Sequence, residues 1–149
     1  MAEVLFYHLE RQPLDRVLPE LLEKCLQRDW RAVVQFGSEE RLEALDSHLW
    51  TYRDDAFLPH GTRRDGHAAR QPVWLTVEDD NPNGAVVRFV ADGADLPDPA
   101  GYQRVVMLFD GQDDEAVGRA RAAWKDLKAA GHEITYWQQS DSGRWERKG

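Results

Sequence analysis

The chain has 149 residues, 42% hydrophobic and 31% charged, and a net charge of −8 at pH 7. This length suits a single domain over residues 1–149 with a core of its own. The acidic balance argues against strong, direct DNA binding, which needs an excess of Lys and Arg. No basic segment with a long apolar run opens the chain, and no stretch reaches the ~20 apolar residues of a membrane span. We therefore expect a cytoplasmic protein without a membrane partner.

Short apolar runs, typical of strands, alternate with segments of helical spacing. We expect Pro13 in the first turn of the first helix, where proline is tolerated. Pro19 departs from the helical pattern, so we expect the regular part of this helix to begin nearer residue 17. In chain order we predict a strand over Val4–Leu9, a helix opened by Pro13, a strand over Trp30–Phe36, a helix capped by Ser38 and ending near Leu49, strands over Pro72–Val77, Ala85–Val90 and Arg104–Asp110, a helix over Asp113–Ala130 and a strand over Ile134–Gln139.

This order of elements favours an α/β three-layer sandwich with a mostly parallel sheet. The link over residues 78–84 has no helix, so the strands on either side form a hairpin or lie at an edge. Residues 51–71 form a long irregular connection, and a charged tail containing Trp145 follows the last strand. Residues 8–13, after the first strand, contain no glycine. The sheet is therefore expected to be Rossmann-like but without a phosphate-binding loop.

Residues suited to catalysis or metal binding are few and scattered. Cys25 lies among apolar residues at helical spacing, which indicates a buried small side chain rather than a nucleophile. The five histidines have no other ligand residue at close spacing, and no serine lies in a nucleophile elbow. We predict no catalytic residue, no metal and no cofactor. The alternative is a small α/β enzyme whose pocket is assembled at the carboxyl ends of the strands.

The helix over Asp113–Ala130 carries the most specific pattern. Arg121, Trp124 and Lys125 are spaced i, i+3 and i+4, which places two cations beside one indole on the same side of a helix. Such a face suits an anionic group attached to an apolar one, for example a peptide that ends in a carboxylate. In the alternative interpretation, Trp124 belongs to an apolar stripe and is wholly buried, and the two cations form a solvated face.

A second candidate surface begins where the helix near Leu49 ends. Trp50, Phe57 and Leu58 bring large apolar side chains to the long loop, where they either cap the core or form an exposed patch for a protein partner. A third possibility is direct DNA binding through the arginines of this loop, which the acidic balance of the chain disfavours. These arginines are Arg63, Arg64 and Arg70.

Several short motifs, taken in their order and spacing, resemble the chi subunit of bacterial DNA polymerase III, and the resemblance spans most of the chain. The motifs are Phe6-Tyr7-His8-Leu9, Leu49-Trp50, Phe57-Leu58-Pro59-His60, and Arg121, Trp124, Lys125 and Gly131 ahead of Tyr136-Trp137. The resemblance implies an α/β fold of nucleotide-binding type. It also implies a subunit of the polymerase holoenzyme that acts in DNA replication as an adaptor without catalysis.

The resemblance further implies two partners. Chi subunits bind the C-terminal tail of single-stranded DNA-binding protein, which is acidic and ends in proline, phenylalanine and a free carboxylate. They reach the clamp loader through the psi subunit. By this resemblance Arg121 and Lys125 hold the tail's acidic groups, and Trp124 lines the pocket for its phenylalanine, while Val117 stands where a further lysine can occur. The positions that face psi are Trp50, Phe57, Leu58 and Pro59.

Overall fold

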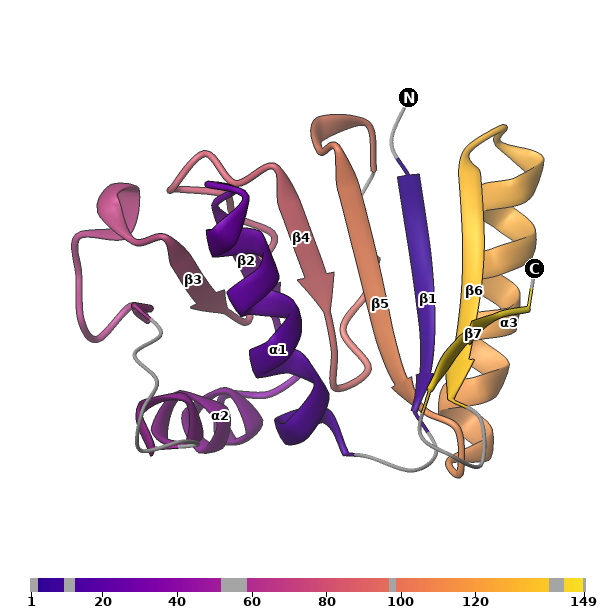
Figure 1. Cartoon of the computed structure of the whole chain (residues 1–149), viewed down its shortest axis with the longest axis horizontal. Coiled ribbons are helices and arrows are strands. Elements are labelled where there is room, and N and C mark those ends of the chain that lie inside the picture. The colour runs from indigo at the N-terminus through magenta and orange to yellow at the C-terminus, as the bar shows by residue number, and fades with distance from the viewer. Residues whose placement is uncertain (1–2, 10–12, 52–58, 97–98, 140–143, 149) are drawn as a thin grey trace.

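Seven strands form one sheet in the computed structural model, which describes residues 3–9, 13–51, 59–96, 99–139 and 144–148 (Figure 1). The strand order is β3-β2-β4-β5-β1-β6-β7, and every neighbouring pair is parallel except β6 and β7. The elements are β1 (Glu3–Leu9), α1 (Leu14–Gln27), β2 (Ala32–Gln35), α2 (Glu39–Thr51), β3 (Val73–Thr76), β4 (Val87–Val90), β5 (Arg104–Asp110), α3 (Asp114–Ala129), β6 (Glu133–Gln139) and β7 (Trp145–Arg147), with 3-10 turns at Ala68–Arg70 and Pro99–Gly101.

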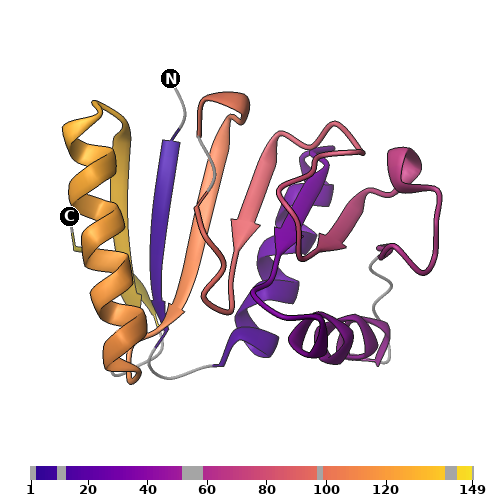
Figure 2. The same ribbon diagram turned by 180° about the vertical axis from the view of Figure 1, so that it is seen from behind.

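The helices cover the sheet from both sides. Leu22 of α1 and Leu45 of α2 belong to one buried cluster, while Ala120 of α3 belongs to another on the opposite face (Figures 1 and 2). Successive residues of a strand point to opposite faces, so Leu5 of β1 joins the first cluster and Phe6 the second. The predicted α/β sandwich with a mostly parallel sheet is therefore confirmed. No helix among the described residues is long and apolar enough to cross a membrane.

Helix α1 begins at Leu14, so the expectation of a start nearer residue 17 was wrong. Pro19 lies inside the helix and has no N–H to donate to the carbonyl of Asp15, four residues earlier. That carbonyl instead accepts a hydrogen bond from Nε2 of His48 on α2, at 2.7 Å. The contact compensates for the missing helical hydrogen bond and joins α1 to α2, which the sequence pattern of α1 alone could not indicate.

The strands β3 and β4 do not form the hairpin that was one of the two expectations. They are both parallel to β2, which lies between them, and only β3 lies at the edge of the sheet. The buried side chain of Asn83 explains this path. Its Nδ2 donates to the carbonyls of Ala32 (3.1 Å) and Gln71 (2.8 Å), which holds the returning chain across the amino ends of β2 and β3. The chain can then enter β4 on the far side of β2.

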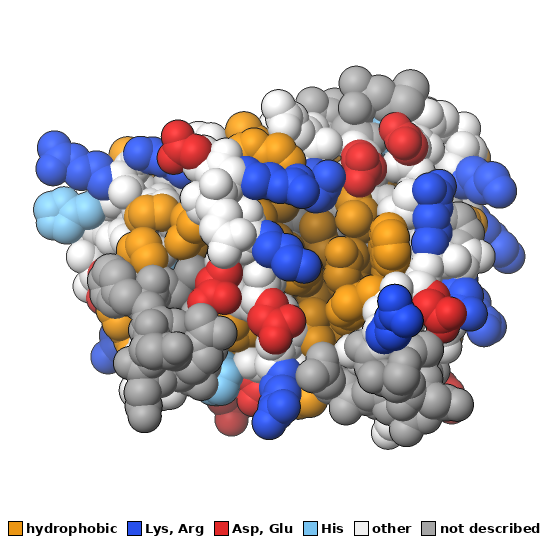
Figure 3. Space-filling view, in the orientation of Figure 1, with side chains coloured by type: hydrophobic (Ala, Val, Ile, Leu, Met, Phe, Trp, Pro, Cys, Tyr) orange, Lys and Arg blue, Asp and Glu red, His pale blue; other side chains and the backbone are white. Residues whose placement is uncertain are grey.

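The charged tail contains a strand that the sequence pattern did not predict. β7 pairs antiparallel with β6, and Trp145 packs against Tyr7 of β1 with ring centroids 4.9 Å apart. Hydrophobic side chains gather on this face between α1 and β7, over strands that no helix covers there (Figure 3). Trp145 therefore shields apolar surface that the chain would otherwise expose. A three-residue strand with two charged side chains has no recognisable strand pattern.

The buried thiol of Cys25 gives a direct test of this packing. Only 7% of the Cys25 surface is exposed, and this burial raises the pKa of the thiol to about 11. Because the thiolate is the reacting form, we expect Cys25 in the folded protein at pH 8 to react with DTNB about 100-fold more slowly than free cysteine. Unfolding in guanidinium should remove the protection. Rapid reaction of the folded protein would show that α1 does not bury this face.

Candidate functional site

Helix α3 connects β5 to β6 and has well-defined electrostatic ends. Asp113 caps its N-terminus, because its side chain accepts hydrogen bonds from the backbone N–H groups of Glu115 (3.0 Å) and Ala116 (3.4 Å). Acidic residues occupy the first turn and Lys128 the last, in the arrangement that the helix dipole favours. The cationic residues of the helix begin at Arg119, beyond its acidic first turn.

The buried side of α3 is formed by small residues. Ala116 and Ala120 are buried against Phe6 and Phe109 of the sheet, while Val117 is half-buried. These small side chains allow the axis of α3 to lie close to the strands. Trp124, one turn after Ala120, is too large for this narrow gap and lies at the border between the helix and the sheet. Helix α3 therefore has the predicted apolar stripe, but Trp124, the largest residue of this stripe, is not completely buried.

Trp124 lies at this border and is half-buried, so the interpretation of a wholly buried indole was wrong. Its ring meets the edges of two other rings, Phe6 of β1 and Tyr136 of β6, each with centroids 5.8 Å apart. Tyr136 is in turn joined to His8 by a hydrogen bond of 2.6 Å between its hydroxyl and Nδ1. The indole is thus held in one orientation, with part of its surface facing solvent.

Three cations flank this indole. Arg121, Lys125 and Lys128 are exposed, and within the described part of the chain their side chains make no hydrogen bond or ion pair. With Trp124 they occupy positions i, i+3, i+4 and i+7 of the helix, which lie on one side of it. We call this surface, made of Arg121, Trp124, Lys125 and Lys128, the cationic face. It can bind an anionic group beside an apolar one without first breaking internal contacts.

Sequence reasoning brought together three of the four residues of the cationic face and missed Lys128. A signal for it was present, because Lys128 follows Trp124 by four residues and lies in the last helical turn, where a cation is favoured. The support of the indole was not visible in the pattern of the helix. Phe6 lies on β1 and Tyr136 on β6. These two strands are more than one hundred residues apart in sequence but are neighbours in the sheet, where the two residues lie opposite each other.

The second candidate surface is described in part. Trp50, at the end of α2, is 48% exposed and contacts the buried ring of His60, with centroids 4.3 Å apart. His60 Nε2 lies 3.0 Å from Oδ1 of Asp46, which fixes the ring beneath the indole. Pro59 is half-buried, and Phe57 and Leu58 lie outside the described residues. Trp50 is therefore a supported, solvent-facing aromatic side chain rather than a cap of the core.

The arginines suggested for DNA binding are spread over the surface and partly paired. Arg63 lies 3.8 Å from a carboxylate oxygen of Glu78, and Arg64 lies 3.6 Å from one of Glu43. Arg70 is exposed. Nearby carboxylates reduce the attraction of this loop for phosphates, so nothing in its geometry favours DNA binding.

The structure also contains a pocket of about 470 Å³ at the carboxyl ends of the strands, which is where the alternative interpretation placed one. It is separate from the cationic face, and its lining includes Leu9 of β1, Val90 of β4 and Asp110 at the end of β5. Among the described residues, no group of three or more His, Cys, Asp or Glu side chains could hold a metal ion.

Comparison with known proteins gives two matches. Residues 1–135 match the family model described as DNA polymerase III chi subunit, HolC. A protein of Rickettsia prowazekii (strain Madrid E), named as a probable DNA polymerase III subunit chi, is 31% identical over 96 residues. That alignment covers 64% of this chain and 58% of the relative's length. The family match includes the cationic face and Trp50, whereas β7 lies beyond it.

Proposed function

The chain belongs to the DNA polymerase III chi subunit family, and from this membership we propose that it is a replication adaptor without catalytic activity of its own. It binds the C-terminal tail of single-stranded DNA-binding protein and links that protein to the clamp-loader assembly of the polymerase. The observation that carries the proposal is the cationic face, in which unpaired cations flank a half-buried indole on one side of α3.

The chemistry of the tail is complementary to this face. By the resemblance, the tail is acidic and ends in phenylalanine with a free carboxylate, so one residue supplies both an apolar ring and an anion. The ring would pack beside Trp124, and Arg121 and Lys125 would bind the carboxylate and the acidic residues before it. An arginine can bind a carboxylate with two parallel hydrogen bonds, which fixes the orientation of the terminal residue. Lys128 extends the positive charge along the path of the tail.

Simple energetics supports reversible binding. Burial of a phenylalanine side chain contributes roughly 1.5–3 kcal/mol, and each charge-assisted hydrogen bond contributes about 1.5–3 kcal/mol. Ordering a flexible tail offsets part of this gain. The remainder corresponds to a Kd on the order of micromolar, or about −8 kcal/mol. Because the cations are exposed, added salt should weaken the complex.

Trp50 and Pro59 support a second part of the proposal, a contact with the psi subunit. Trp50 is 48% exposed and held by the His60 ring, which gives a fixed aromatic anchor of the kind that protein interfaces use. It lies at the end of α2, away from α3 (Figure 1). A partner bound there would leave the cationic face free, as an adaptor with two partners requires.

Calorimetric titration tests the tail-binding proposal. We expect a short acidic peptide ending in Pro-Phe to bind with a Kd on the order of micromolar, and the same peptide without its last phenylalanine to bind about 10- to 100-fold more weakly. The truncated peptide still ends in a carboxylate and has the same charge, so the comparison isolates the terminal ring from general charge attraction. Equal affinity for both peptides would contradict a specific pocket at Trp124, and no binding of either would contradict the tail-binding role.

A further inference from the structure

The pocket at the carboxyl ends of the strands occupies a special place in the topology of the sheet. β1 and β5 are neighbours, but α1 leaves the end of β1 toward one face and α3 leaves the end of β5 toward the other. Chain segments that diverge in this way open a crevice at the carboxyl ends of the two strands, and open α/β sheets bind small ligands in such crevices. Leu9 and Asp110, the last residues of β1 and β5, both line the pocket.

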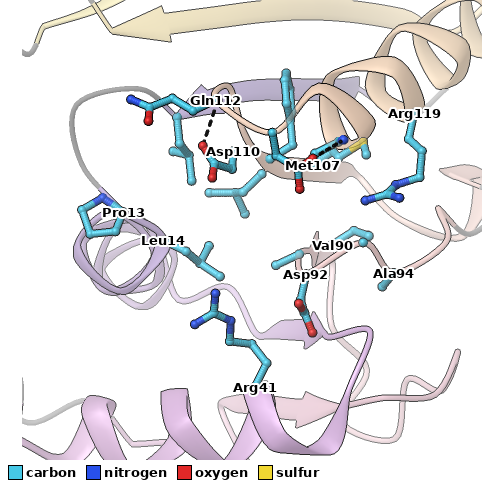
Figure 4. Close-up of a pocket in the computed structure, with 17 residues that line it drawn as sticks. Pro13, Leu14, Arg41, Val90, Asp92, Ala94, Met107, Asp110, Gln112 and Arg119 are labelled. Carbon is cyan, nitrogen blue, oxygen red and sulfur yellow. Dashed lines mark hydrogen bonds between the residues drawn. The ribbon is translucent and has the colours of Figure 1, made fainter.

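The pocket combines an apolar interior with a polar opening. Leu14, Val90, Met107 and Ala116 are among the residues that line it, and its volume of about 470 Å³ lies in the usual range for small-molecule sites. The polar side chains that line it are Arg41, Asp92, Asp110, Gln112, Asp113 and Arg119. Figure 4 shows Arg41 on α2, Asp92 after β4, Asp110 at the end of β5 and Arg119 on α3 around the opening.

Two arginines at this opening have no partner within the described part of the chain. The guanidinium groups of Arg41, in the first turn of α2, and Arg119, on α3, form no hydrogen bond or ion pair there. Both are turned toward the same opening in Figure 4. Gly93 makes room for Arg119, because a Cβ at that position would lie 3.2 Å from its Nη2.

The three carboxylates of the pocket already have local hydrogen bonds. Asp92 accepts one from the hydroxyl of Ser38 (2.8 Å), and Asp110 accepts one from the backbone N–H of Gln112 (2.9 Å). Asp113 caps α3. None of them forms an ion pair with Arg41 or Arg119, so the two guanidinium groups keep their donors for a bound anion. The carboxylates nevertheless limit how much negative charge a ligand can bring.

We propose that this pocket binds a small phosphate monoester with an apolar part, of about the size of a nucleoside monophosphate. A phosphate monoester carries up to two negative charges on three terminal oxygens, so it can accept hydrogen bonds from two guanidinium groups at once and offset both of their charges. The side-chain donors take the place of the backbone donors that a glycine-rich loop would supply. The apolar lining accepts the body of the ligand. A triphosphate is disfavoured, because its additional charges meet Asp92, Asp110 and Asp113.

AMP is a suitable probe, and its binding to the full chain can be followed by calorimetry and by amide shifts in NMR spectra. We expect saturable binding, with adenosine at least about tenfold weaker because it lacks the anion, and ATP also weaker than AMP. Arg41→Ala and Arg119→Ala should each weaken AMP binding by about 10- to 100-fold, the loss of hydrogen bonds to a charged group. Both side chains are exposed, so the variants should keep the wild-type Tm.

Arg121→Ala is the matched control, since Arg121 is exposed on the same helix but does not line the pocket. It should leave AMP binding unchanged. Shifts confined to amides near Ala94 and Gln112 would place the ligand in the pocket. The proposal is overturned if AMP does not bind at millimolar concentration, if adenosine binds as well as AMP, or if neither pocket variant changes the affinity. None of these outcomes bears on the peptide titration, which concerns the opposite side of α3.

Discussion

The double variant Arg121→Ala/Lys125→Ala is expected to bind the Pro-Phe peptide at least about 100-fold more weakly than the wild type. Each cation contributes roughly 1.5–3 kcal/mol through a charge-assisted hydrogen bond, and each 1.4 kcal/mol is a factor of ten in Kd. Both side chains are exposed and unpaired in the described part of the chain, so the fold should be unaffected. Calorimetry at low salt gives the change in Kd, and thermal unfolding checks the fold.

The helix supplies its own control for this experiment. Arg119→Ala removes one positive charge from α3, but Arg119 lines the pocket at the strand ends and lies outside the cationic face. If the tail binds at the cationic face, Arg119→Ala should change the Kd by less than about twofold, through weak long-range charge effects only. A similar loss for both variants would mean that the peptide responds to the net charge of the helix. Wild-type affinity in the double variant would exclude the cationic face as the binding site.

The order of the elements could be predicted from local patterns, because each strand and helix buries residues at its own period. The pairing of the strands could not. The path into β4 involves Asn83, whose side chain reaches carbonyls 51 and 12 residues away in sequence, and β7 is accompanied by the contact of Trp145 with Tyr7. Such contacts have no signature in either segment alone. The Asp15 carbonyl, which Pro19 leaves without a helical donor, likewise finds its partner in His48 of another helix.

The candidate site also has features that local sequence patterns predict and features that they do not. Helical spacing was sufficient to place Arg121, Trp124 and Lys125 on one face, since that relation is local. The exposed fraction of Trp124 was not predictable, because it depends on how closely the small residues Ala116 and Ala120 let α3 approach the sheet. For the pocket, the sequence predicted only a place, the carboxyl ends of the strands, and none of the lining residues. Arg41 and Arg119 come from different helices, and only the folded chain brings them together.

Arg88 is the residue whose importance was least visible in the sequence. It lies in the middle of β4 and is completely buried. All five of its N–H donors are used: Nε and Nη2 donate to Oε1 of Gln35 (3.1 and 2.8 Å), Nη1 to the carbonyl of Asp80 (2.7 Å) and the hydroxyl of Tyr102 (3.1 Å), and Nη2 to the carbonyl of Glu78 (2.7 Å). The acidic turn over residues 78–80 thus folds over a buried cation.

Replacing Arg88 with methionine should therefore be strongly destabilising. The change removes one partner only and leaves the carbonyls of Glu78 and Asp80 and the amide oxygen of Gln35 without donors, which is the costly case for a buried polar network. We expect a loss of about 3–5 kcal/mol in the free energy of unfolding and a Tm lower by roughly 10 °C.

The matched control for this change is Arg64→Met, which removes an exposed arginine 3.6 Å from Glu43. It should alter the free energy of unfolding by no more than about 0.5 kcal/mol, because exposed ion pairs contribute little. Both variants lose one positive charge, so denaturant unfolding separates the effect of removing a buried side chain from the effect of changing the net charge. If Arg88→Met were as stable as Arg64→Met, the turn over residues 78–84 would not depend on Arg88, and the path of the chain from β3 to β4 would rest on Asn83 alone.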